Sequence, residues 1–531
     1  MKADFDSPPM TDNHQKEVGP VVSVLISTFN RPGYLAEALT SVLRQSYTNL
    51  QVIVVNDGGE DVRDIIDSFN DSRLIYINGK ENRGKASCLN RAINRADCKY
   101  IAYIDDDDLY YPNHIETLVD VLENQTDCRV AYSDLYKVSC RVMPDGSRQV
   151  LSKVVEVSRD FDRFLMLYFN HVLHVSLMHD RTLLEKTGPY NEELRVLVDW
   201  DIIRRLAFFS DFQHVTEITG EYYNPVGECD RISVQKRKDI NGYLKNVRTI
   251  RATRPPKPWS KIRDLSIIFV AEKMDEQAKQ TLNAIRQRTF YPYEIYLPLS
   301  RADYERLGMD IPNIVHVPVD SFEPQTRRID AAIARCDGGY VAIVPSGFPI
   351  RQFWVEDSLY ALISSSSCPK GLELEGSTDG LWAAVMERSV FENARRNFSS
   401  QTVQRSLRAS GISIRRVLAD EIPFQLDQLL EQSRLAEKNG EPVKAARMFE
   451  YIAGRYQNQL WMKTLAAGAF FNAGDLNRAD QLCCELNRQR PVVDTLLLEA
   501  KIRRSKKEFE PAIGLLEEAE QILEGKELLW I

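Results

Sequence analysis

The stretch YIAYIDDDDLYYP, residues 100–112, decides the fold class of this chain of 531 residues. Its apolar and aromatic first part, residues 100–104, predicts a buried strand, and four consecutive aspartates follow at the carboxyl end of that strand. Crowded carboxylates repel one another, and a hard divalent cation with oxygen ligands, Mg²⁺ or Mn²⁺, removes the repulsion and also binds phosphate. A solvated acidic loop is the alternative. The hydrophobic strand that enters the run favours a metal site in the aspartate run, which consists of Asp105, Asp106, Asp107 and Asp108.

Three further apolar stretches precede this strand, and segments with helical spacing separate them. Residues 21–26, 52–55 and 74–77 predict strands. Strands that alternate with helices predict a mostly parallel α/β sheet, in which ligands bind outside the carboxyl ends of the strands. Asn30, Asp57 and the aspartate run all follow strands, so we expect their side chains to converge in space.

Several polar and aromatic residues near these strand ends are candidates for binding a nucleotide. Asp57 can accept a hydrogen bond from a base N–H or a ribose hydroxyl, although an Asp-Gly pair also forms turns. Phe29 can stack on a nucleobase or close the edge of the core. Arg83 and Lys85 flank Gly84 at a helix start, which is either an anion site or a pair of solvated charges.

A later segment, residues 196–206, predicts a helix that opens at Asp199 and packs inward through Ile202, Ile203 and Leu206. A carboxylate at a helix start can face a cleft as a general base. It can equally serve as the N-cap, and then Asp199 or Asp201 would cap the helix. The sequence alone leaves both readings open.

His171, His174 and His179 crowd one segment, although the chain has only seven histidines. A zinc site is one reading of this cluster. The spacings of three and five residues and the lack of a nearby cysteine favour structural or acceptor-site roles instead.

The composition excludes several classes of protein. Hydrophobic residues make up 44% and charged residues 27%, which excludes a disordered or fibrous chain, and a net charge of −8 argues against nucleic acid as the partner. Nine cysteines without a Cys-x-x-Cys pair are typical of reduced thiols in the cytoplasm. The sequence shows no signal peptide and no membrane-spanning stretch, so we expect a cytoplasmic protein, and peripheral membrane contact stays open.

The second part of the chain repeats the pattern of the first. Residues 251–262, rich in proline, predict a linker. The sequence from Leu265 then resembles that from Val22, and the sequence from Ala334 resembles that from Asn94. In this alignment Pro345, Ser346, Gly347 and Phe348 replace the aspartate run, and Ser300 replaces Asp57. We therefore expect a second copy of the α/β domain that keeps the fold and lacks metal chemistry.

The last part of the chain, residues 425–531, changes to amphipathic helices. Ala445, Ala479 and Ala512 recur at intervals of 34 and 33 residues, each shortly after a turn. This period is typical of tetratricopeptide repeats, and three repeats suffice for a stable stack. We expect this region to bind a protein partner or to position a large acceptor.

Five separated motifs together resemble the family-2 glycosyltransferases, which are inverting enzymes with the GT-A fold. The motifs span residues 20–223 in the order of that family. They are VSVLISTFNR (22–31), VVNDG (54–58), ENRGKASCLN (81–90), YIAYIDDDDLYYP (100–112) and GPYNEELRVLVDWDIIRRL (188–206). The resemblance implies a catalytic GT-A domain at 20–250 and, through the repeat, a degenerate GT-A-like domain at 263–420. The polar composition of residues 1–19 predicts a disordered tail before them.

The resemblance also implies roles for individual residues and a cofactor. Asp199 would be the catalytic base, and Asp107 with Asp105 would bind Mn²⁺ or Mg²⁺. The residues expected to bind the nucleotide-sugar are Ser27, Phe29, Asn30, Arg31, Asp57, Arg83, Lys85, Asp105 and Asp106. The family often has Glu-Asp where this chain has Val198-Asp199, which puts the acceptor contacts of that glutamate in doubt. The Gln-x-x-Arg-Trp motif of processive members is missing, which favours transfer of a single sugar.

The expected function is metal-dependent, inverting transfer of one sugar from a UDP- or dTDP-sugar to an acceptor hydroxyl. The acceptor would be a glycan, a lipid-linked molecule or a protein, in surface polysaccharide assembly or protein glycosylation. Two alternatives remain. A sugar-1-phosphate nucleotidyltransferase would need a Gly-rich phosphate loop, where this chain has Ser27-Thr28-Phe29-Asn30. A scaffold would bind nucleotide-sugar without catalysis and act through its repeats, which the intact aspartates argue against.

Overall fold

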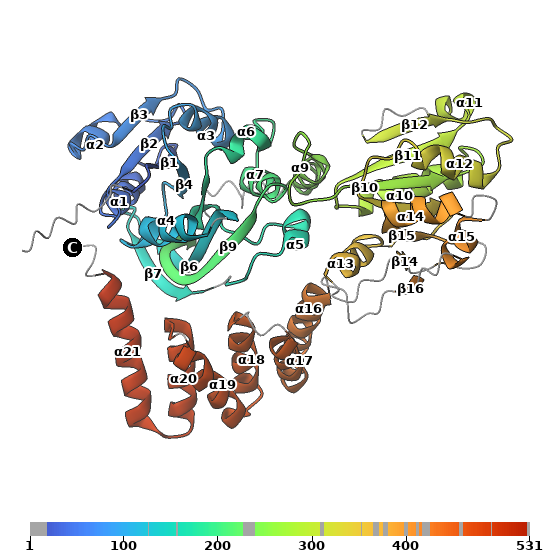
Figure 1. The fold of residues 1–531 in the computed structure, drawn as a ribbon. Coiled ribbons are helices and arrows are strands. Elements are labelled where there is room, and N and C mark those ends of the chain that lie inside the picture. Colours follow the sequence, from blue (N-terminus) through green and yellow to red (C-terminus); the bar gives the residue numbers. More distant parts are fainter. Residues whose placement is uncertain are drawn as a thin grey trace, which may run out of the picture.

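The structure is a computed structural model, shown in Figure 1. It describes residues 19–125, 127–155, 158–226, 239–307, 313–351, 353–364, 371–374, 377, 381–397, 402–409, 414–416, 425–455, 460–489 and 491–527. Apart from Gly19, the tail predicted at residues 1–19 lies outside this range.

The first sheet contains the four predicted strands in parallel, in the order β3-β2-β1-β4. They are β1 (Val22–Thr28), β2 (Leu50–Asn56), β3 (Leu74–Asn78) and β4 (Tyr100–Asp105). The helices around them are α1 (Pro32–Leu43), α2 (Arg63–Ser68), α3 (Lys85–Ile93) and α4 (His114–Asn124). Along β1, Leu25 packs into one core cluster while Val24 and Ile26 pack into another. Both faces of this strand are therefore covered, which explains its unbroken apolar sequence.

The sheet continues beyond β4 with mixed strand directions, in the order β4-β8-β6-β9-β5, and β7 pairs with the outer part of β6. These strands are β5 (Leu109–Tyr110), β6 (Cys128–Val142), β7 (Arg148–Val154), β8 (Leu177–Asp180) and β9 (Asp211–Pro225). The remaining helices of this domain are α5 (Arg163–Tyr168), η1 (His174–Ser176), α6 (Leu183–Thr187), α7 (Val198–Leu206) and α9 (Ile240–Ala252). The long strands β6 and β9, together with β7, form a ribbon that reaches the aspartate run from the side. We call these three strands the ribbon.

The second sheet repeats the topology of the first. Its strand order is β12-β11-β10-β13, all parallel, followed by β15, β14 and β16. In the first sheet Ser27 lies opposite Asp105, and in the second Val270 lies opposite Pro345, as the sequence alignment predicts. The strands are β10 (Leu265–Val270), β11 (Tyr293–Leu299), β12 (Ile314–Pro318), β13 (Tyr340–Pro345), β14 (Gly371–Glu373), β15 (Ala384–Glu387) and β16 (Ile414–Arg416). The helices are α10 (Glu276–Arg288), α11 (Arg301–Glu305), α12 (Gln325–Ile333), α13 (Glu356–Ser364), α14 (Arg388–Asn397) and α15 (Val403–Ala409).

The two α/β units share one continuous hydrophobic core. The ring of Tyr168 in α5 lies 5.0 Å from that of Phe290 and 4.9 Å from that of Phe353, between ring centroids. The proline-rich segment packs as well, because the ring of Trp259 lies edge-on to Phe208 at 4.9 Å. The segment predicted as a linker therefore joins the units closely and does not act as a loose tether.

Glu356 lies at this boundary, fully buried at the start of α13. Its Oε1 accepts hydrogen bonds from the backbone N–H groups of Phe290 at 2.8 Å and Tyr291 at 3.2 Å. Burial nevertheless raises the pKa of this carboxyl to about 7. Because the ordinary value lies near 4.5, the folded chain keeps a proton that the unfolded chain releases between pH 4.5 and 7. The stability contributed by this group therefore falls as the pH rises through that window.

We expect Glu356→Gln to remove this pH dependence. The neutral amide keeps an oxygen acceptor for Phe290 and Tyr291 without a charge to bury, so the variant should be stabilised at about pH 8 by up to about 3 kcal/mol. Urea unfolding midpoints at about pH 5 and pH 8 measure the effect. Glu276→Gln, at an exposed position on α10, should behave as the wild type. Equal pH dependence in Glu356→Gln and the wild type would contradict the assignment.

The C-terminal region is helical in the part that the structure describes, as predicted. Its helices are α16 (Gln425–Lys438), α17 (Pro442–Arg455), α18 (Leu460–Asn472), α19 (Leu476–Gln489), α20 (Val493–Ser505) and α21 (Phe509–Glu527). Gly440, Gly474 and Lys507, again spaced by 34 and 33 residues, each have a positive φ in the turn within a helix pair. Ala445, Ala479 and Ala512 are buried where the paired helices meet, which explains their small size. The assignment to tetratricopeptide repeats stays a prediction.

The end of this helical array packs back against the first domain. Val493 and Leu496 of α20 share a hydrophobic cluster with Tyr136 and Val138 of β6 and Tyr223 of β9. Helix α20 also contacts β7, and Figure 1 shows α20 and α21 beneath the first sheet. The helical region therefore supports the ribbon from the outside.

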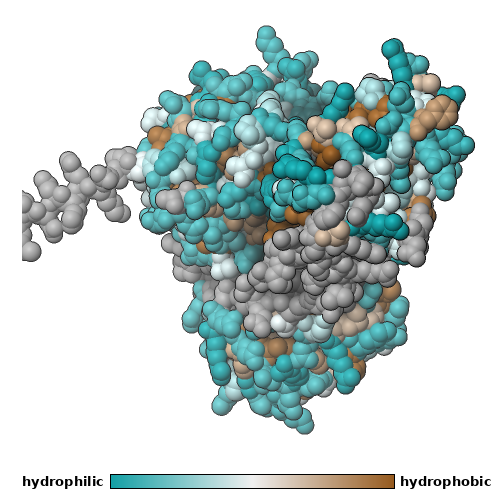
Figure 2. Space-filling view, turned by 45° about the vertical axis from the view of Figure 1, so that its right-hand side comes forward, coloured by the Kyte–Doolittle hydropathy of each residue, from teal (hydrophilic) through white to brown (hydrophobic). Residues whose placement is uncertain are grey.

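No helix among the described residues is long and apolar enough to cross a bilayer. Hydrophilic residues dominate the described part of the face in Figure 2, where hydrophobic residues occur in small groups.

Candidate active site

The carboxyl ends of β1 and β4 bring the aspartate run against two basic side chains. Arg31, at the start of α1, reaches Asp107 Oδ2 at 2.9 Å and Asp106 Oδ1 at 3.4 Å through its Nη1. Lys85, the first residue of α3, forms an ion pair with Asp105. The strand order explains this meeting, because β1 lies between β2 and β4 and both helices start at the same edge. Arg31 and Lys85 therefore both contact the aspartate run, and their proposed contacts with a donor stay predictions.

Three carboxylates of the run form a group that could hold a cation. One oxygen each from Asp105, Asp107 and Asp108 lie within 4.8 Å of one another. The donor set is all oxygen, which suits Mg²⁺ or Mn²⁺. The group contains both predicted metal ligands, Asp105 and Asp107, and adds Asp108, to which the sequence analysis gave no separate role. The backbone N–H of Tyr223 donates to Asp108 Oδ1 at 2.9 Å and orients that carboxylate.

Asp106 is not a member of this group, and its side chain contacts the end of β1. Its Oδ2 accepts a hydrogen bond from Thr28 Oγ1 at 2.8 Å, and its side chain is nearly buried. Burial raises the pKa of Asp106 to about 6, and Asp107 adds to the rise while Arg31 opposes it. In this structure Asp106 supports the turn, and its expected contact with the donor stays a prediction.

Asp57 lies beside the start of α3 and is nearly buried. Its two carboxylate oxygens accept hydrogen bonds from the backbone N–H groups of Arg83 and Gly84, each at 2.9 Å. The carboxylate thereby ties the end of β2 to the N-terminus of α3, where negative charge is favoured. Each oxygen keeps a further acceptor position for a base or ribose donor.

The two basic residues at this helix start differ from each other. The Arg83 side chain is 59% exposed and lies 4.0 Å from Glu192, so it fits the reading of a solvated charge. Lys85 is enclosed. Burial alone would lower its pKa, but Asp105, followed by Asp199 and Asp108, outweighs burial and raises it. Lys85 therefore stands as a cation among carboxylates from two distant parts of the chain.

Ser27, Phe29 and Asn30 follow the course of β1 to the same edge. Ser27 lies in register between Val55 and Asp105. Phe29 is 42% exposed, so it lies at the edge of the core and presents part of its side chain to solvent. Asn30 has a φ of 56°, and its side-chain oxygen accepts from the backbone N–H of Glu60 at 2.8 Å. Phe29 is thus open to a ligand, whereas Asn30 shapes the loop after β2.

Asp199 lies in the first turn of α7, half-buried. Asn170 Nδ2 donates to its Oδ2 at 3.1 Å. The N-cap position belongs to Leu197, which has a φ of 63° and no side-chain cap, so the capping reading of Asp199 and Asp201 is wrong. Asp201 is buried and paired with Arg205 at 2.5 Å, which makes it a structural residue. The predicted inward packing of Ile202, Ile203 and Leu206 is confirmed.

The three clustered histidines have separate structural roles. Tyr103 bonds His179 at 2.7 Å, Tyr190 bonds His174 at 2.8 Å, and His171 accepts from the backbone N–H of Asp162 at 3.3 Å. Burial lowers the pKa of His171 and His174 to about 3 and that of His179 to about 4. They are neutral packing residues, and no metal-competent group found among the described residues includes them.

Thr28, Asn170, Arg148 and Tyr223 contact the site and were missed by the sequence analysis. Thr28 ends β1, one residue after the candidate Ser27, so its position was a usable signal. The other three come from a loop or from the ribbon, and they reach the site only through the pairing of strands far apart in the sequence. Their local sequence carries no periodic or motif signal.

In the second α/β unit an arginine occupies the corresponding edge. Helices α3 and α12 hold the same place before β4 and β13, and Arg328 of α12 stands at the position of Cys88 in α3. The buried Arg328 guanidinium donates to the carbonyls of Ala271 and Pro298, each at 3.3 Å, and of Ser321 at 2.6 Å. A fixed cation thus fills the strand ends where the first unit presents carboxylates.

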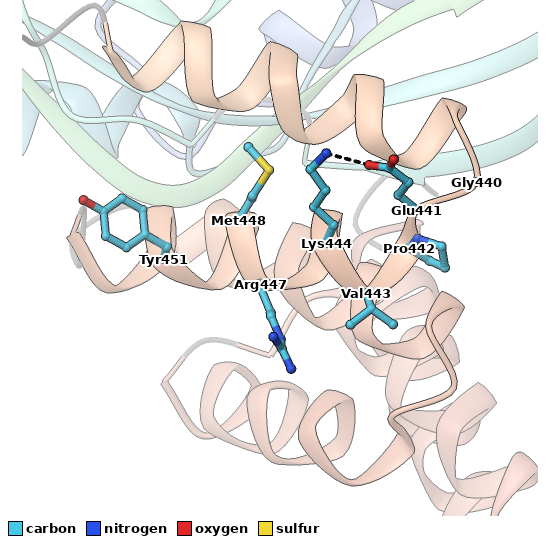
Figure 3. Close-up of a pocket in the computed structure, with 8 residues that line it drawn as sticks. All are labelled: Gly440, Glu441, Pro442, Val443, Lys444, Arg447, Met448 and Tyr451. Atoms are coloured by element: carbon cyan, nitrogen blue, oxygen red, sulfur yellow. Dashed lines mark hydrogen bonds and ion pairs between the residues drawn. The ribbon is translucent and has the colours of Figure 1, made fainter.

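A hollow of about 650 Å³ lies on α17, far from these residues along the chain (Figure 3). Lys444 and Glu441 pair there at 2.7 Å. Its lining residues are Gly440, Glu441, Pro442, Val443, Lys444, Arg447, Met448 and Tyr451. The hollow has one carboxylate and is open, so it does not match a nucleotide-sugar site.

The comparisons with known proteins agree with this geometry. Residues 23–176 match the family described as Glycosyl transferase family 2. An uncharacterized glycosyltransferase, RP339, of Rickettsia prowazekii is 33% identical over 194 residues, which are 35% of this chain and 59% of that protein. Another, MJ1057 of Methanocaldococcus jannaschii, is 29% identical over 232 residues, which are 42% of this chain and 78% of that protein. The hyaluronan synthase of Pasteurella multocida is 29% identical over 232 residues, which are 43% of this chain and 22% of that protein.

Among solved structures, S. aureus TarS 1–349 matches with 16% identity and a TM-score of 0.34, covering 44% of this chain and 65% of that one. A likeness of this size supports no conclusion about ligands. The aligned region covers about three fifths of the length of RP339. The first domain of this chain is a family-2 glycosyltransferase domain with a GT-A-like sheet.

Proposed function

We propose that the chain is a metal-dependent, inverting glycosyltransferase that moves one sugar from a nucleotide-sugar to an acceptor hydroxyl. One observation carries the proposal: one oxygen each from Asp105, Asp107 and Asp108 lie within 4.8 Å of one another, and Lys85 forms an ion pair with Asp105. The carboxylate of Asp199, the proposed base from a distant part of the chain, also helps to raise the pKa of Lys85, which supports a common site. The family match of residues 23–176 supports the reaction class.

In this proposal the two groups of carboxylates have different tasks. Asp105, Asp107 and Asp108 hold Mn²⁺ or Mg²⁺, which when bound supplies positive charge to stabilise the departing nucleoside diphosphate. Asp199 removes the proton from the acceptor hydroxyl as that oxygen attacks the anomeric carbon. Asn170 donates a hydrogen bond to Oδ2 of Asp199 and thereby orients that carboxylate. A single base and direct displacement invert the anomeric centre.

The donor would lie along the strand ends of β1 and β2. Phe29 would stack on the base and Asp57 would accept a hydrogen bond from it, which suits uracil or thymine and hence a UDP- or dTDP-sugar. Lys85 is placed to contact the diphosphate once the donor arrives. The remaining residues proposed to contact the donor are Ser27, Asn30, Arg31, Arg83, Asp105 and Asp106.

A binding panel tests the proposal. Calorimetry with UDP, dTDP and GDP, each with and without Mn²⁺, should show binding of UDP or dTDP that depends on the metal. Absence of any nucleotide binding would contradict the proposal and favour the scaffold. Supplying a nucleotide-sugar should release the nucleoside diphosphate. Formation of a nucleotide-sugar and pyrophosphate from a nucleoside triphosphate and a sugar 1-phosphate would instead identify a nucleotidyltransferase.

The acceptor and the protein partner are proposed here by chemical class. We propose a glycan, lipid-linked or protein acceptor, in surface polysaccharide assembly or protein glycosylation in the cytoplasm, including at a membrane surface. The helical region would bind a protein partner or a large acceptor. The hollow on α17 is the candidate contact site for that binding. Removing residues 425–531 is a poor test, because it would uncover the cluster around Tyr136 and Tyr223.

A further inference from the structure

The ribbon holds the turn of the aspartate run at two successive residues. The backbone N–H of Tyr223 in β9 donates to Asp108 Oδ1 at 2.9 Å. Arg148, the first residue of β7, donates from Nη1 to the backbone carbonyl of Asp107 at 2.6 Å. The turn that carries two of the three grouped carboxylates is therefore fixed from outside the four parallel strands.

Arg148 is itself held on several sides. Its guanidinium carbon lies 3.6 Å from the ring centroid of Tyr223 and 4.8 Å from that of Tyr34. Nη2 forms an ion pair with Glu37 of α1, and the side chain is only 6% exposed. A planar guanidinium can stack on rings and donate in its plane at once, which a lysine ammonium cannot do. The contact with Asp107 is thus set by a rigid group.

The contact is made to the main chain of the turn and to none of its carboxylates. Arg31 already pairs with the side chains of Asp106 and Asp107, so it compensates their charge directly. The contact of Arg148 with the carbonyl of Asp107 instead determines where the backbone of the turn lies, and hence where the carboxylates of Asp107 and Asp108 point. Mg²⁺ and Mn²⁺ sites depend on such placement, because Mg²⁺ in particular demands near-ideal octahedral geometry.

We propose that Arg148 is a positioning residue that keeps the carboxylates of Asp107 and Asp108 in the arrangement that binds the divalent cation. This inference rests on the proposed function, because it assumes that the aspartate run binds a metal. It adds a residue from β7, outside every motif of the resemblance, to the machinery of the site.

The sign of the effect separates positioning from simple electrostatics. Removing a positive charge near a cation site should by itself tighten the binding of Mn²⁺. Loss of the fixed turn should weaken it. Arg148→Gln is therefore expected to raise the dissociation constant of Mn²⁺, measured by calorimetry in the presence of UDP, by at least about tenfold.

Arg141→Gln is the matched control. Arg141 lies exposed on the same β6–β7 hairpin, and its replacement by glutamine removes the same positive charge. It should bind Mn²⁺ as the wild type does. Arg148→Lys should fall between Arg148→Gln and the wild type, and it decides the question if Arg148→Gln fails to fold. In turnover, the Mn²⁺ concentration for half-maximal rate should rise more than the KM for acceptor.

Wild-type or tighter Mn²⁺ binding in a folded Arg148→Gln would overturn the inference and leave the proposed function standing. If Arg148→Gln does not fold, wild-type affinity of Arg148→Lys for Mn²⁺ would likewise overturn the inference and leave the proposed function standing. A wild-type protein that binds UDP with no dependence on Mn²⁺ would overturn both.

Discussion

Replacing Asp199 by asparagine should reduce the rate of sugar transfer by about 10²–10⁴-fold while leaving nucleotide binding intact. The amide cannot take the proton of the acceptor hydroxyl, but it nearly preserves the volume of the side chain beside Asn170. Because the proposed donor residues lie at the ends of β1, β2 and β4 and at the start of α3, and none lies on α7, the affinity for UDP should not change. Release of nucleoside diphosphate from a nucleotide-sugar in the presence of acceptor measures the first effect, and calorimetry with UDP and Mn²⁺ measures the second.

Glu193→Gln provides the control for Asp199→Asn, since Glu193 is an exposed carboxylate in the segment just before α7. It should retain full turnover. Full turnover in a folded Asp199→Asn would show that another group acts as the base. Reduced turnover together with lost UDP binding would indicate a general loss of structure.

Asp107→Asn should abolish metal-dependent activity by removing a charged ligand from the group of three. We expect Mn²⁺ binding to weaken by at least about tenfold, and turnover to fall with it, because an amide oxygen carries no net charge to offer a hard cation. Arg31 keeps its contact with Asp106, so the fold around α1 should persist. Turnover measured over a range of Mn²⁺ concentrations, with far-ultraviolet circular dichroism for folding, checks the prediction.

Two controls accompany this variant. Asp97→Asn, at an exposed position between α3 and β4, should leave Mn²⁺ dependence unchanged. Chelation of divalent cations should inactivate the wild type, and added Mn²⁺ should restore it. Activity that survives both chelation and Asp107→Asn would exclude a metal-dependent mechanism at this site.

Much of the first sheet could be predicted from the sequence, because β1, β2 and β4 are largely buried and the half-buried edge strand β3 is still apolar, so all four are seen as short apolar runs. The same argument placed Asp57 and the aspartate run at one edge. The outer part of the sheet could not be predicted in this way. Strands β6 and β9 are long and partly exposed, and their pairing joins residues such as Ser133 and Val215 that no local pattern connects.

In the α7 segment, the residue pattern alone could not assign different roles to two neighbouring aspartates. Asp199 and Asp201 are equivalent by sequence, and each could cap the helix or face a cleft. Arg205, one helical turn after Asp201, pairs with it in the interior, whereas Asn170 from a distant loop contacts Asp199. The resemblance had favoured Asp199 as the base, and the packing of that loop against α7 gives the physical difference between the two carboxylates.

The sequence by itself determined the alternation of strands and helices, the repetition of the α/β unit without its carboxylates and the period of about 34 residues in the last region. These features depend on local composition and spacing. They can therefore be predicted without knowing which distant residues are in contact. The tertiary structure decided which of the four aspartates face one another and which one, Asp106, turns inward to Thr28. That choice depends on Arg31, Arg148 and Tyr223, which reach the turn from other elements, and on the free energy of burying a carboxylate only where donors meet it.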